Sequence, residues 1–440
     1  MGKSCQNPSL PVRIRDPIYG TIEVEAHEAP LVDHPLFQRL RHIRQLGFGE
    51  LAFPGATHTR HSHSLGAMFL VSRLWFCLQK HLPLPPKLLA RMGAALRITA
   101  LLHDIGHLPF SHSLEKAAPP RAHLQLPSWL PGEGGGRAKH EDFSLRLLLD
   151  SSLTPTLAGV LERFELRPED VASLLVFATP PHGNVFMVEG VDYAPLLRSL
   201  VAGELDADRM DYLSRDSFFT GVNYGRFDLD WLLHNIEVAV VDNRACLAIG
   251  QRAAFAFEDF LQSRWHMFLS VYYHRTSTAY EQMLLRYCQS AGEAFEVPLS
   301  SEAFMHFDDV HLLGLLRNSN NPWAQRIVSR QVFRLAADFT ERDKHWNLGA
   351  LCTLLEEAGV EHFSVQSKAQ LSRYDAQNNP LDLYVVDAER GQCTPVSEYL
   401  PLYAHWKAVH LSRIYVHPEQ HALAKKLIHT HAHNTQANTP

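Results

Sequence analysis

The stretch "LLHDIGHLPFSH", residues 101–112, places three histidines and one aspartate directly after an apolar run. The apolar residues between 94 and 102 predict a buried helix, so Asp104 is predicted to be buried at its end. A buried carboxylate is costly unless a metal ion or a charged partner compensates it. Imidazole and carboxylate ligands together suit Mn²⁺, Fe²⁺, Zn²⁺ or Ni²⁺. The pair His103-Asp104 therefore predicts a metal centre at this helix end.

Two other stretches offer further ligands for such a centre. The run "TRHSHSLG" at 59–66 contains His63, and "ELDADRMDYLSRD" at 204–216 contains Asp208. Asp208 and Tyr212 are four residues apart and so share one face of a helix. Each feature alone also fits an ordinary role, because single histidines are often structural and acidic helix faces are usually solvated. Their combination with a buried His-Asp pair favours a metal site.

The composition is that of a globular protein, with 440 residues of which 46% are hydrophobic and 20% charged, enough for more than one domain. A net charge of −6 excludes a global positive field, so an anionic substrate requires a local basic pocket. Six cysteines without CxxC spacing indicate neither a zinc knuckle nor a disulfide framework. The chain shows no signal-peptide core and no apolar stretch long enough to span a bilayer. We expect a cytoplasmic protein with no membrane or nucleic-acid partner.

The spacing of apolar residues is helical over most of the chain, and we expect a mainly α fold. The expected architecture is an all-helical core with a short N-terminal strand pair, a β-hairpin and a smaller α+β C-terminal portion. The expected boundaries are 1–30 for the strand and turn segment, 31–290 for the core, 291–420 for the C-terminal portion and 421–440 for a polar, frayed tail.

Several segments interrupt the helical pattern. Alternating residues predict strands at 12–25 and a hairpin at 236–250, and in the C-terminal portion at 362–368, 381–389 and 412–418. Residues 116–139 are rich in proline and glycine and lie between His112 and His140, so they predict a mobile lid. A tolerated surface insertion is the alternative.

Six stretches, in order, resemble one known family. They are "RDPIYGTIEV", "HPLFQRLRHIRQLG", "FPGATHTRHSHSLG", "LLHDIGHLPFSH", "KHED" and "DADRMDYLSRD". They are similar to the motifs of the HD-domain deoxynucleoside triphosphate (dNTP) triphosphohydrolases, a family of bacterial dGTPase-like proteins and the vertebrate SAM-and-HD-domain enzyme. The resemblance covers about residues 12–230, more weakly to about 290, and no SAM domain is present.

The resemblance implies roles for individual residues. The metal ligands are His63, His103, Asp104 and Asp208. The catalytic group near the metal and at the α-phosphate comprises His107, His112, Glu115, His140 and Glu141. Within it, His112 protonates the departing 5′ oxygen, and Glu115 orients His112 where the family has an aspartate. Their spacing of three residues allows that hydrogen bond.

The resemblance also implies the substrate contacts. Arg60 and Arg209 match phosphate contacts, with Arg209 in place of a lysine. The deoxyribose is expected to meet Gln45, Leu46, Tyr212 and Asp216. In the stretch 264–281, Tyr280 matches a base-contacting tyrosine, whereas the position of a phosphate-binding arginine falls on or near Tyr272. His274 or Arg275 are the available substitutes, and the choice of nucleotide stays open.

A second nucleotide site is also implied. In regulated members, an Asp, a Gln and an Arg near the N-terminus hold an activating guanine nucleotide at a subunit interface. Asp33, Gln38 and Arg41 match those positions. The alternative is that Asp33 caps a helix and Arg41 forms a surface salt bridge. The family also implies a homo-oligomer, from dimer to hexamer.

The implied activity is metal-dependent hydrolysis of a dNTP to a deoxynucleoside and inorganic triphosphate. The divalent ion is Mn²⁺, Fe²⁺, Mg²⁺, Zn²⁺ or Ni²⁺, because the ligand set suits several. One alternative is another HD phosphohydrolase, acting on nucleoside monophosphates, (p)ppGpp or cyclic dinucleotides; the deoxyribose matches disfavour it. The other is a non-catalytic, nucleotide-responsive assembly factor, which would need neither the metal set nor His112 and Glu115.

Overall fold

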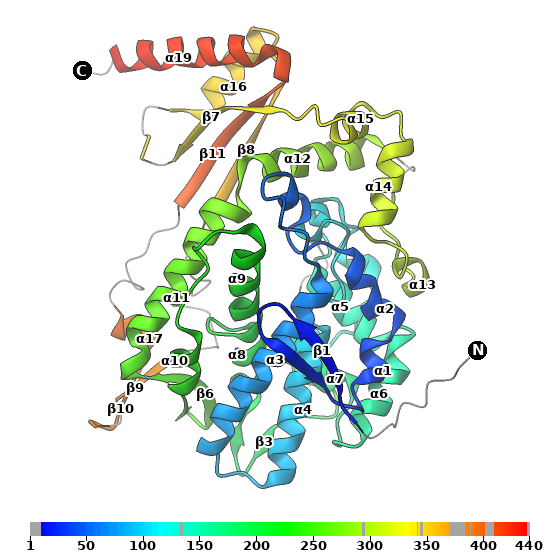
Figure 1. Cartoon of the computed structure of the whole chain (residues 1–440), viewed down its shortest axis with the longest axis vertical. Coiled ribbons are helices and arrows are strands. Elements are labelled where there is room, and N and C mark those ends of the chain that lie inside the picture. Colours follow the sequence, from blue (N-terminus) through cyan, green and yellow to red (C-terminus); the bar gives the residue numbers. More distant parts are fainter. Residues whose placement is uncertain are drawn as a thin grey trace.

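The computed structural model describes residues 10–132, 135–292, 295–340, 342–343, 346–369, 383–387, 389–400 and 409–437. A large helical body carries a small three-stranded sheet with two helices at one end (Figure 1). This arrangement confirms the mainly α fold expected from the sequence. In the described part of the chain, no helix is long and apolar enough to cross a membrane.

The chain begins with the predicted strand pair. Strands β1 (Val12–Asp16) and β2 (Gly20–Val24) pair antiparallel. Asp16 stabilises their turn by accepting hydrogen bonds from the backbone N–H groups of Ile18 and Tyr19, at 2.9 and 3.0 Å. Two short helices follow, α1 (Ala29–Val32) and α2 (Pro35–Gln38).

Three helices form the centre of the body. Helix α3 (Arg60–Leu78) packs against both α4 (Pro86–Leu102) and α9 (Ala207–Thr220). Gly66 allows α9 to approach α3 closely, because a Cβ atom at this position would lie 1.9 Å from the Asp211 carboxylate. The predicted metal ligands on α3 and at the end of α4 therefore lie close to the first turns of α9.

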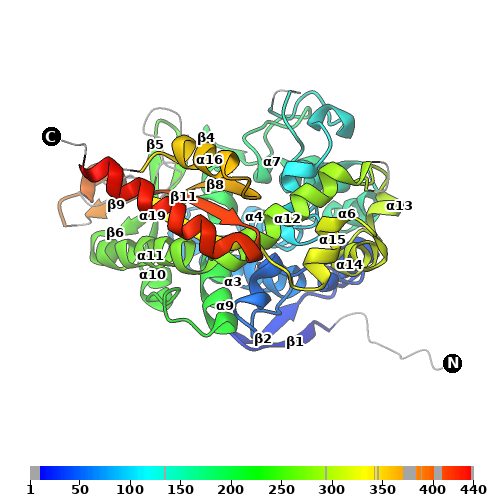
Figure 2. The ribbon, with the colours of Figure 1, turned by 90° about the horizontal axis from the view of Figure 1, so that it is seen from above.

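Other helices surround this centre. They are α5 (His140–Leu149), α6 (Leu153–Glu162), α7 (Pro168–Leu175), α8 (Ala194–Ala202), α10 (Leu229–His234), α11 (Ala254–Met267) and α12 (Arg275–Ser290). Helices α13 (Ser301–Phe304), α14 (Asp309–Asn318) and α15 (Pro322–Val328) follow along the same side as α2 and α12 (Figures 1 and 2).

The predicted hairpin forms the middle of a larger sheet. Strands β5 (Ile236–Val241) and β6 (Arg244–Gly250) pair antiparallel across Asp242 and Asn243, whose φ angles of 50° and 59° suit a tight hairpin turn. The sheet also contains β3 (Met187–Val188), β4 (Val191–Asp192), β9 (Tyr384–Asp387) and β10 (Gln392–Pro395), and α17 (Val396–Tyr399) follows β10.

The C-terminal portion is therefore divided between two places. Strand β9, within the strand predicted at 381–389, pairs parallel with β6 of the core sheet. The predicted strands at 362–368 and 412–418 appear as β8 (His362–Ala369) and β11 (Val409–Val416) of the separate small sheet. Its order is β7-β11-β8, where β7 (Arg334–Thr340) replaces part of a predicted helical stretch. Strand β7 pairs with β11, which lies far along the chain, and local residue spacing does not predict such a pairing.

The prediction of a frayed tail is wrong for residues 421–437, because they form helix α19. Ala424 and Ile428 are four residues apart and buried, and the helix packs on β7 and on α16 (Leu348–Glu357). Figure 2 shows α19 lying across the small sheet. The polar residues dominate the composition of the segment, but two apolar positions on one face are enough to seat it.

Candidate metal centre and substrate cavity

The four predicted metal ligands lie together at one point of the core. His63 comes from α3, Asp208 from α9, and His103 and Asp104 from the end of α4. The Nε2 atom of His63 lies 3.3 Å from His103 Nε2, 2.9 Å from Asp208 Oδ1 and 3.5 Å from Asp104 Oδ2. His103 Nε2 lies 3.4 Å from Asp104 Oδ1. Two imidazole nitrogens and two carboxylates thus face a common centre.

The charges of this cluster fit a cation. Burial disfavours a charged imidazole, but hydrogen bonds to Asp208 and Asp211 raise the pKa of His63 to about 10. Burial raises the pKa of the Asp208 carboxyl, yet hydrogen bonds from His103 and His63 hold it well below its ordinary value. The carboxylates therefore stabilise positive charge between the two imidazoles, where a divalent ion would be bound by two nitrogens and two oxygens.

Further buried charges orient His63. Its Nδ1–H donates to Asp211 Oδ2 at 2.7 Å, which leaves Nε2 directed at the centre. Arg215 donates two hydrogen bonds to the Asp211 carboxylate, both at 2.9 Å, and one to Asp16 at 2.8 Å. Asp211 belongs to the aspartates of the 204–216 stretch that offered possible ligands, whereas Arg215 was not predicted; the i, i+4 spacing of the two residues was the available signal.

A second cluster of titratable groups lies beside the metal centre. The Oε1 atom of Glu115 accepts hydrogen bonds from His112 Nδ1 at 2.9 Å and from His140 Nδ1 at 2.7 Å. The ring of His107 stacks on His140 with centroids 4.0 Å apart. Glu141 lies 3.3 Å from His140 Nδ1. The structure thus brings together all five residues of the predicted catalytic group.

The backbone that joins the two clusters has an unusual conformation. Gly106 allows close approach to α5, since a Cβ atom there would lie 2.2 Å from the Ser144 nitrogen. Phe110 and Ser111 follow with φ angles of 55° and 56°, in the left-handed region that non-glycine residues rarely adopt. A 3₁₀ helix, Ser111–Ala117, then carries His112 with its side chain 62% exposed. This turn aims His112 at open space next to the metal centre.

Both clusters open into a cavity of about 740 Å³. Such a volume lies within the range of small-molecule sites. The predicted substrate contacts that line it are Gln45, Leu46, Arg60, Arg209, Tyr212 and Asp216. Arg60 donates to Asp104 Oδ2 at 2.6 Å, and Arg209 donates to Glu204 Oε2 at 2.8 Å. Two buried guanidinium groups thus stand at the wall, each paired with a carboxylate.

The chain is similar to known proteins in sequence and in structure. The profile of the HD associated region matches residues 227–347. The chain is 32% identical to protein MJ1154 of Methanocaldococcus jannaschii over 73% of this chain and 58% of that protein. It is 27% identical to the human deoxynucleoside triphosphate triphosphohydrolase SAMHD1 over 64% of this chain and 45% of that enzyme. The crystal structure of a phosphohydrolase from Bacteroides thetaiotaomicron superposes with a TM-score of 0.66 at 25% identity, covering 92% of this chain and all of that one.

In sequence and in structure the chain is thus similar to HD-domain, dNTPase-like proteins. A hypothetical protein from Aquifex aeolicus has a similar structure, with a TM-score of 0.73 at 25% identity over 95% of this chain and 100% of that chain. The ligand atoms of His63, His103 and Asp208 lie within 4.8 Å of one another, close enough to hold one metal ion. The match spans about half the length of SAMHD1 and 58% of MJ1154.

Tyr280 is not among the residues that line this cavity, and its contact with a base stays a prediction. Tyr280 is 2% exposed and its ring stacks on Phe48 in the core. From this stretch, Tyr272 and Tyr273 line the cavity, and the hydroxyl of Tyr272 donates to Asp216 Oδ2 at 2.9 Å. Tyr272 ends a π-helical turn, Phe268–Tyr272, whose wider winding interrupts the α-helical period.

The phosphate-binding arginine of this stretch has a different candidate. His274 accepts a hydrogen bond from the Thr276 backbone at the start of α12, and neither it nor Arg275 lines the cavity. Arg264, one π-turn earlier on α11, does line it.

One wall of the cavity comes from the distant small sheet. Val365, Gln366 and Ser367 of β8 line the cavity, and the hydroxyl of Tyr273 donates to the carbonyl of Lys368 at 3.0 Å. Arg413 of β11 donates to the carbonyl of Tyr273. The C-terminal portion, whose role the sequence did not indicate, thus forms one wall of the cavity.

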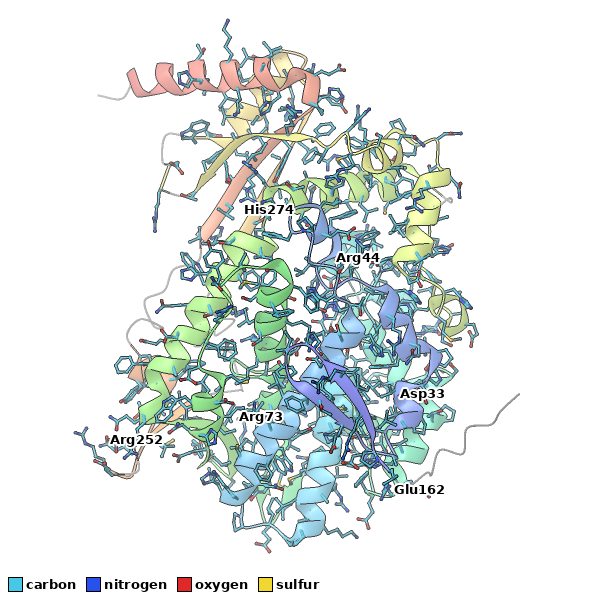
Figure 3. All side chains as sticks on the ribbon, viewed as in Figure 1. Asp33, Arg44, Arg73, Glu162, Arg252 and His274 are labelled. Atoms are coloured by element: carbon cyan, nitrogen blue, oxygen red, sulfur yellow. The ribbon has the colours of Figure 1, made fainter. Side chains whose placement is uncertain are left out.

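The predicted lid and activator residues lie at other places. In the predicted lid, Arg121 donates to Asp142 at 2.7 Å, and the mobility of residues 116–139 stays a prediction. At the predicted activator site, Gln38 donates to the carbonyl of Val32 at 2.7 Å and accepts from Arg41 at 2.6 Å. Asp33 follows α1 and lies at the outer edge of the body, well away from Arg44 beside the cavity (Figure 3). These residues form one surface cluster, and their nucleotide binding stays a prediction.

Replacing Asp211 by asparagine is expected to weaken metal binding by about 10- to 100-fold, because it disturbs the support that orients His63. The measurement is competition with a chelator of known affinity. Asp230→Asn is the control, since Asp230 pairs with Arg73 on the surface. Equal affinity in wild type and Asp211→Asn would show that the support is not needed.

Replacing Glu281 by glutamine is expected to stabilise the protein at alkaline pH. Burial raises the pKa of Glu281 from 4.5 to about 7, although Lys116 opposes the shift. The unfolded chain releases this proton first, so ionisation favours unfolding as the pH rises from about 4.5 to 7. Glutamine removes that penalty, of about 1–2 kcal/mol at a cavity wall. Denaturant unfolding should show a larger gain at pH 8 than at pH 5.5; an equal gain would contradict the assignment.

Proposed function

We propose that this chain is a metal-dependent dNTP triphosphohydrolase, which cleaves a dNTP to a deoxynucleoside and inorganic triphosphate. The observation that carries the proposal is the joint opening of two clusters into one cavity: the four-residue centre at His63 and the hydrogen-bonded group at Glu115. Similarity to SAMHD1 supports the nucleotide class. The HD-type phosphohydrolase neighbour supports phosphate ester hydrolysis in general.

The residues of the centre would hold one divalent ion. When bound, that ion supplies Lewis-acid polarisation of a phosphoryl oxygen and lowers the pKa of an attacking water. The ligands we propose are His63, His103, Asp104 and Asp208, whose donor set fits several divalent metals. Arg60 and Arg209 would bind phosphate oxygens, since both guanidinium groups line the cavity.

The leaving 5′ oxygen requires a proton, and we assign His112 as the donor. Its Nδ1–H is held by Glu115, which leaves Nε2 to face the cavity. A carboxylate that accepts from both His112 and His140 stabilises the protonated imidazole until the proton is transferred. Glu115 therefore replaces the family's aspartate in this role.

The remaining cavity residues would select the sugar. Gln45, Leu46 and Tyr212 stand together at the wall with Asp216, which is already bound by His58 at 2.7 Å and by Tyr272 at 2.9 Å. This buried network fixes the Tyr272 ring and the Asp216 carboxylate, so that a bulky 2′ hydroxyl is disfavoured. An activating nucleotide at Asp33, Gln38 and Arg41, and assembly into a homo-oligomer, are further parts of the proposal.

The test is product analysis of purified protein with Mn²⁺ or Mg²⁺ and each dNTP, alone and in mixtures. Release of deoxynucleoside and inorganic triphosphate is the expected result, and faster turnover in mixtures would support an activator. Release of monophosphate or pyrophosphate would instead indicate another HD phosphohydrolase. No turnover with any metal or mixture would favour a nucleotide-responsive assembly factor.

A further inference from the structure

The segment between α13 and α14 contacts the turn that precedes His112, although it lies far from that turn in the sequence. Asp309, the first residue of α14, is 4% exposed. Its Oδ1 accepts a hydrogen bond from the Phe110 backbone at 2.6 Å, and its Oδ2 accepts one from the Arg44 backbone at 2.9 Å. One carboxylate thus joins the turn before His112 to the segment before Gln45.

A buried arginine binds the other end of the same turn. Arg39 donates to the carbonyl of His107 at 2.6 Å, to that of Ile105 at 3.3 Å and to that of Phe307 at 2.9 Å. Its guanidinium lies 4.2 Å from the centroid of the Phe304 ring. Residues 304–309 are therefore linked to both ends of the turn, directly at Phe110 and through Arg39 at His107.

This contact is at the strained part of the backbone. The left-handed φ angles of Phe110 and Ser111 persist only where surrounding structure holds them. Ser111 adds a third link by donating to the carbonyl of Arg44 at 2.7 Å. Relaxation of these two residues would rotate the 3₁₀ helix that carries His112.

Asp309 has no part in starting its own helix. That function belongs to Asp308, whose Oδ1 accepts from the His311 backbone at 2.9 Å. The two adjacent aspartates thus have different partners, one within α14 and one across the molecule. The pair offers a matched control in a single helix turn.

We infer that Asp309 is a positioning residue for His112, which acts by fixing the left-handed turn at Phe110 and Ser111. Only the kinetic test of this inference rests on the proposed function. Asparagine at this position would turn its NH₂ group, a donor, toward one of the two backbone N–H groups. Asp309→Asn therefore breaks one of the two hydrogen bonds while keeping the side-chain volume.

The kinetic experiment compares Asp309→Asn with Asp308→Asn in the metal-loaded protein. For Asp309→Asn we expect kcat to fall about 10- to 100-fold with KM and metal content unchanged, because small displacements of a reacting group have effects of this size. For Asp308→Asn we expect wild-type kcat. Equal kcat in wild type and Asp309→Asn, or equal losses in both variants, would overturn the inference.

A second readout needs no substrate. Histidine-selective ¹³C NMR should show the His112 and His107 signals moving in Asp309→Asn, whereas the His63 signal stays in place. Unchanged His112 and His107 signals would overturn the inference even if no dNTP is hydrolysed, which separates its failure from that of the proposed function. If Asp309→Asn does not fold, Asp309→Glu, which retains the charge but displaces the carboxylate, should show the same signal changes and about a 10-fold loss of kcat.

Discussion

Replacing Asp208 by alanine is expected to abolish both metal binding and turnover. Asp208 Oδ1 lies 2.9 Å from His63 Nε2 and 3.5 Å from His103 Nε2, so its loss removes one carboxylate ligand and its contacts with both imidazoles. Because a metal supplies several kcal/mol of transition-state stabilisation, we expect kcat/KM to fall at least about a thousand-fold.

Elemental analysis and steady-state kinetics check this expectation. Asp230→Ala is the control, since that carboxylate lies 73% exposed on α10 and pairs only with Arg73 among the described residues. It should retain both metal and turnover. Full activity in Asp208→Ala would show that the metal centre is wrongly placed, and loss of activity with full metal content would limit Asp208 to another role.

Replacing His112 by alanine is expected to keep the metal and lose the reaction. His112 stands outside the four-residue centre, and its side chain is largely exposed to the cavity. Removal of a positioned proton donor lowers turnover by about 10²- to 10⁴-fold. Metal content and nucleotide binding should be unchanged, as measured by elemental analysis and by equilibrium binding.

Glu115→Gln is the companion variant to His112→Ala. The Glu115 carboxylate accepts from both His112 and His140, so glutamine keeps the shape but loses the negative charge that stabilises the imidazolium. We expect a smaller loss of kcat than in His112→Ala. Loss of metal from His112→Ala, or wild-type turnover in either variant, would contradict the role proposed for this group.

The burial of the candidate metal centre could be predicted from local sequence. An apolar run before His103-Asp104 predicted burial, and the structure places Asp104 at 3% exposure at the end of α4. A buried carboxylate requires a compensating charge. An apolar run that leads into a His-Asp pair therefore indicates a charged partner or a metal ion, even when the fold is not known. His63 and Asp208 were assigned as ligands from the resemblance to a known family, because their separation along the chain does not predict their distance in space.

The tertiary structure alone decided which distant segments complete the site. The His63–Asp211–Arg215–Asp16 network joins three separate elements, and the wall at Val365 and the link at Asp309 come from beyond residue 300. A π-helical turn placed Tyr272, rather than Tyr280, at the cavity. Local spacing reports which face of an element is buried, whereas the partners of that face depend on packing between elements far apart in the chain. The sequence by itself therefore determined the helical class and the chemistry at the end of α4, and only packing decided what surrounds that chemistry.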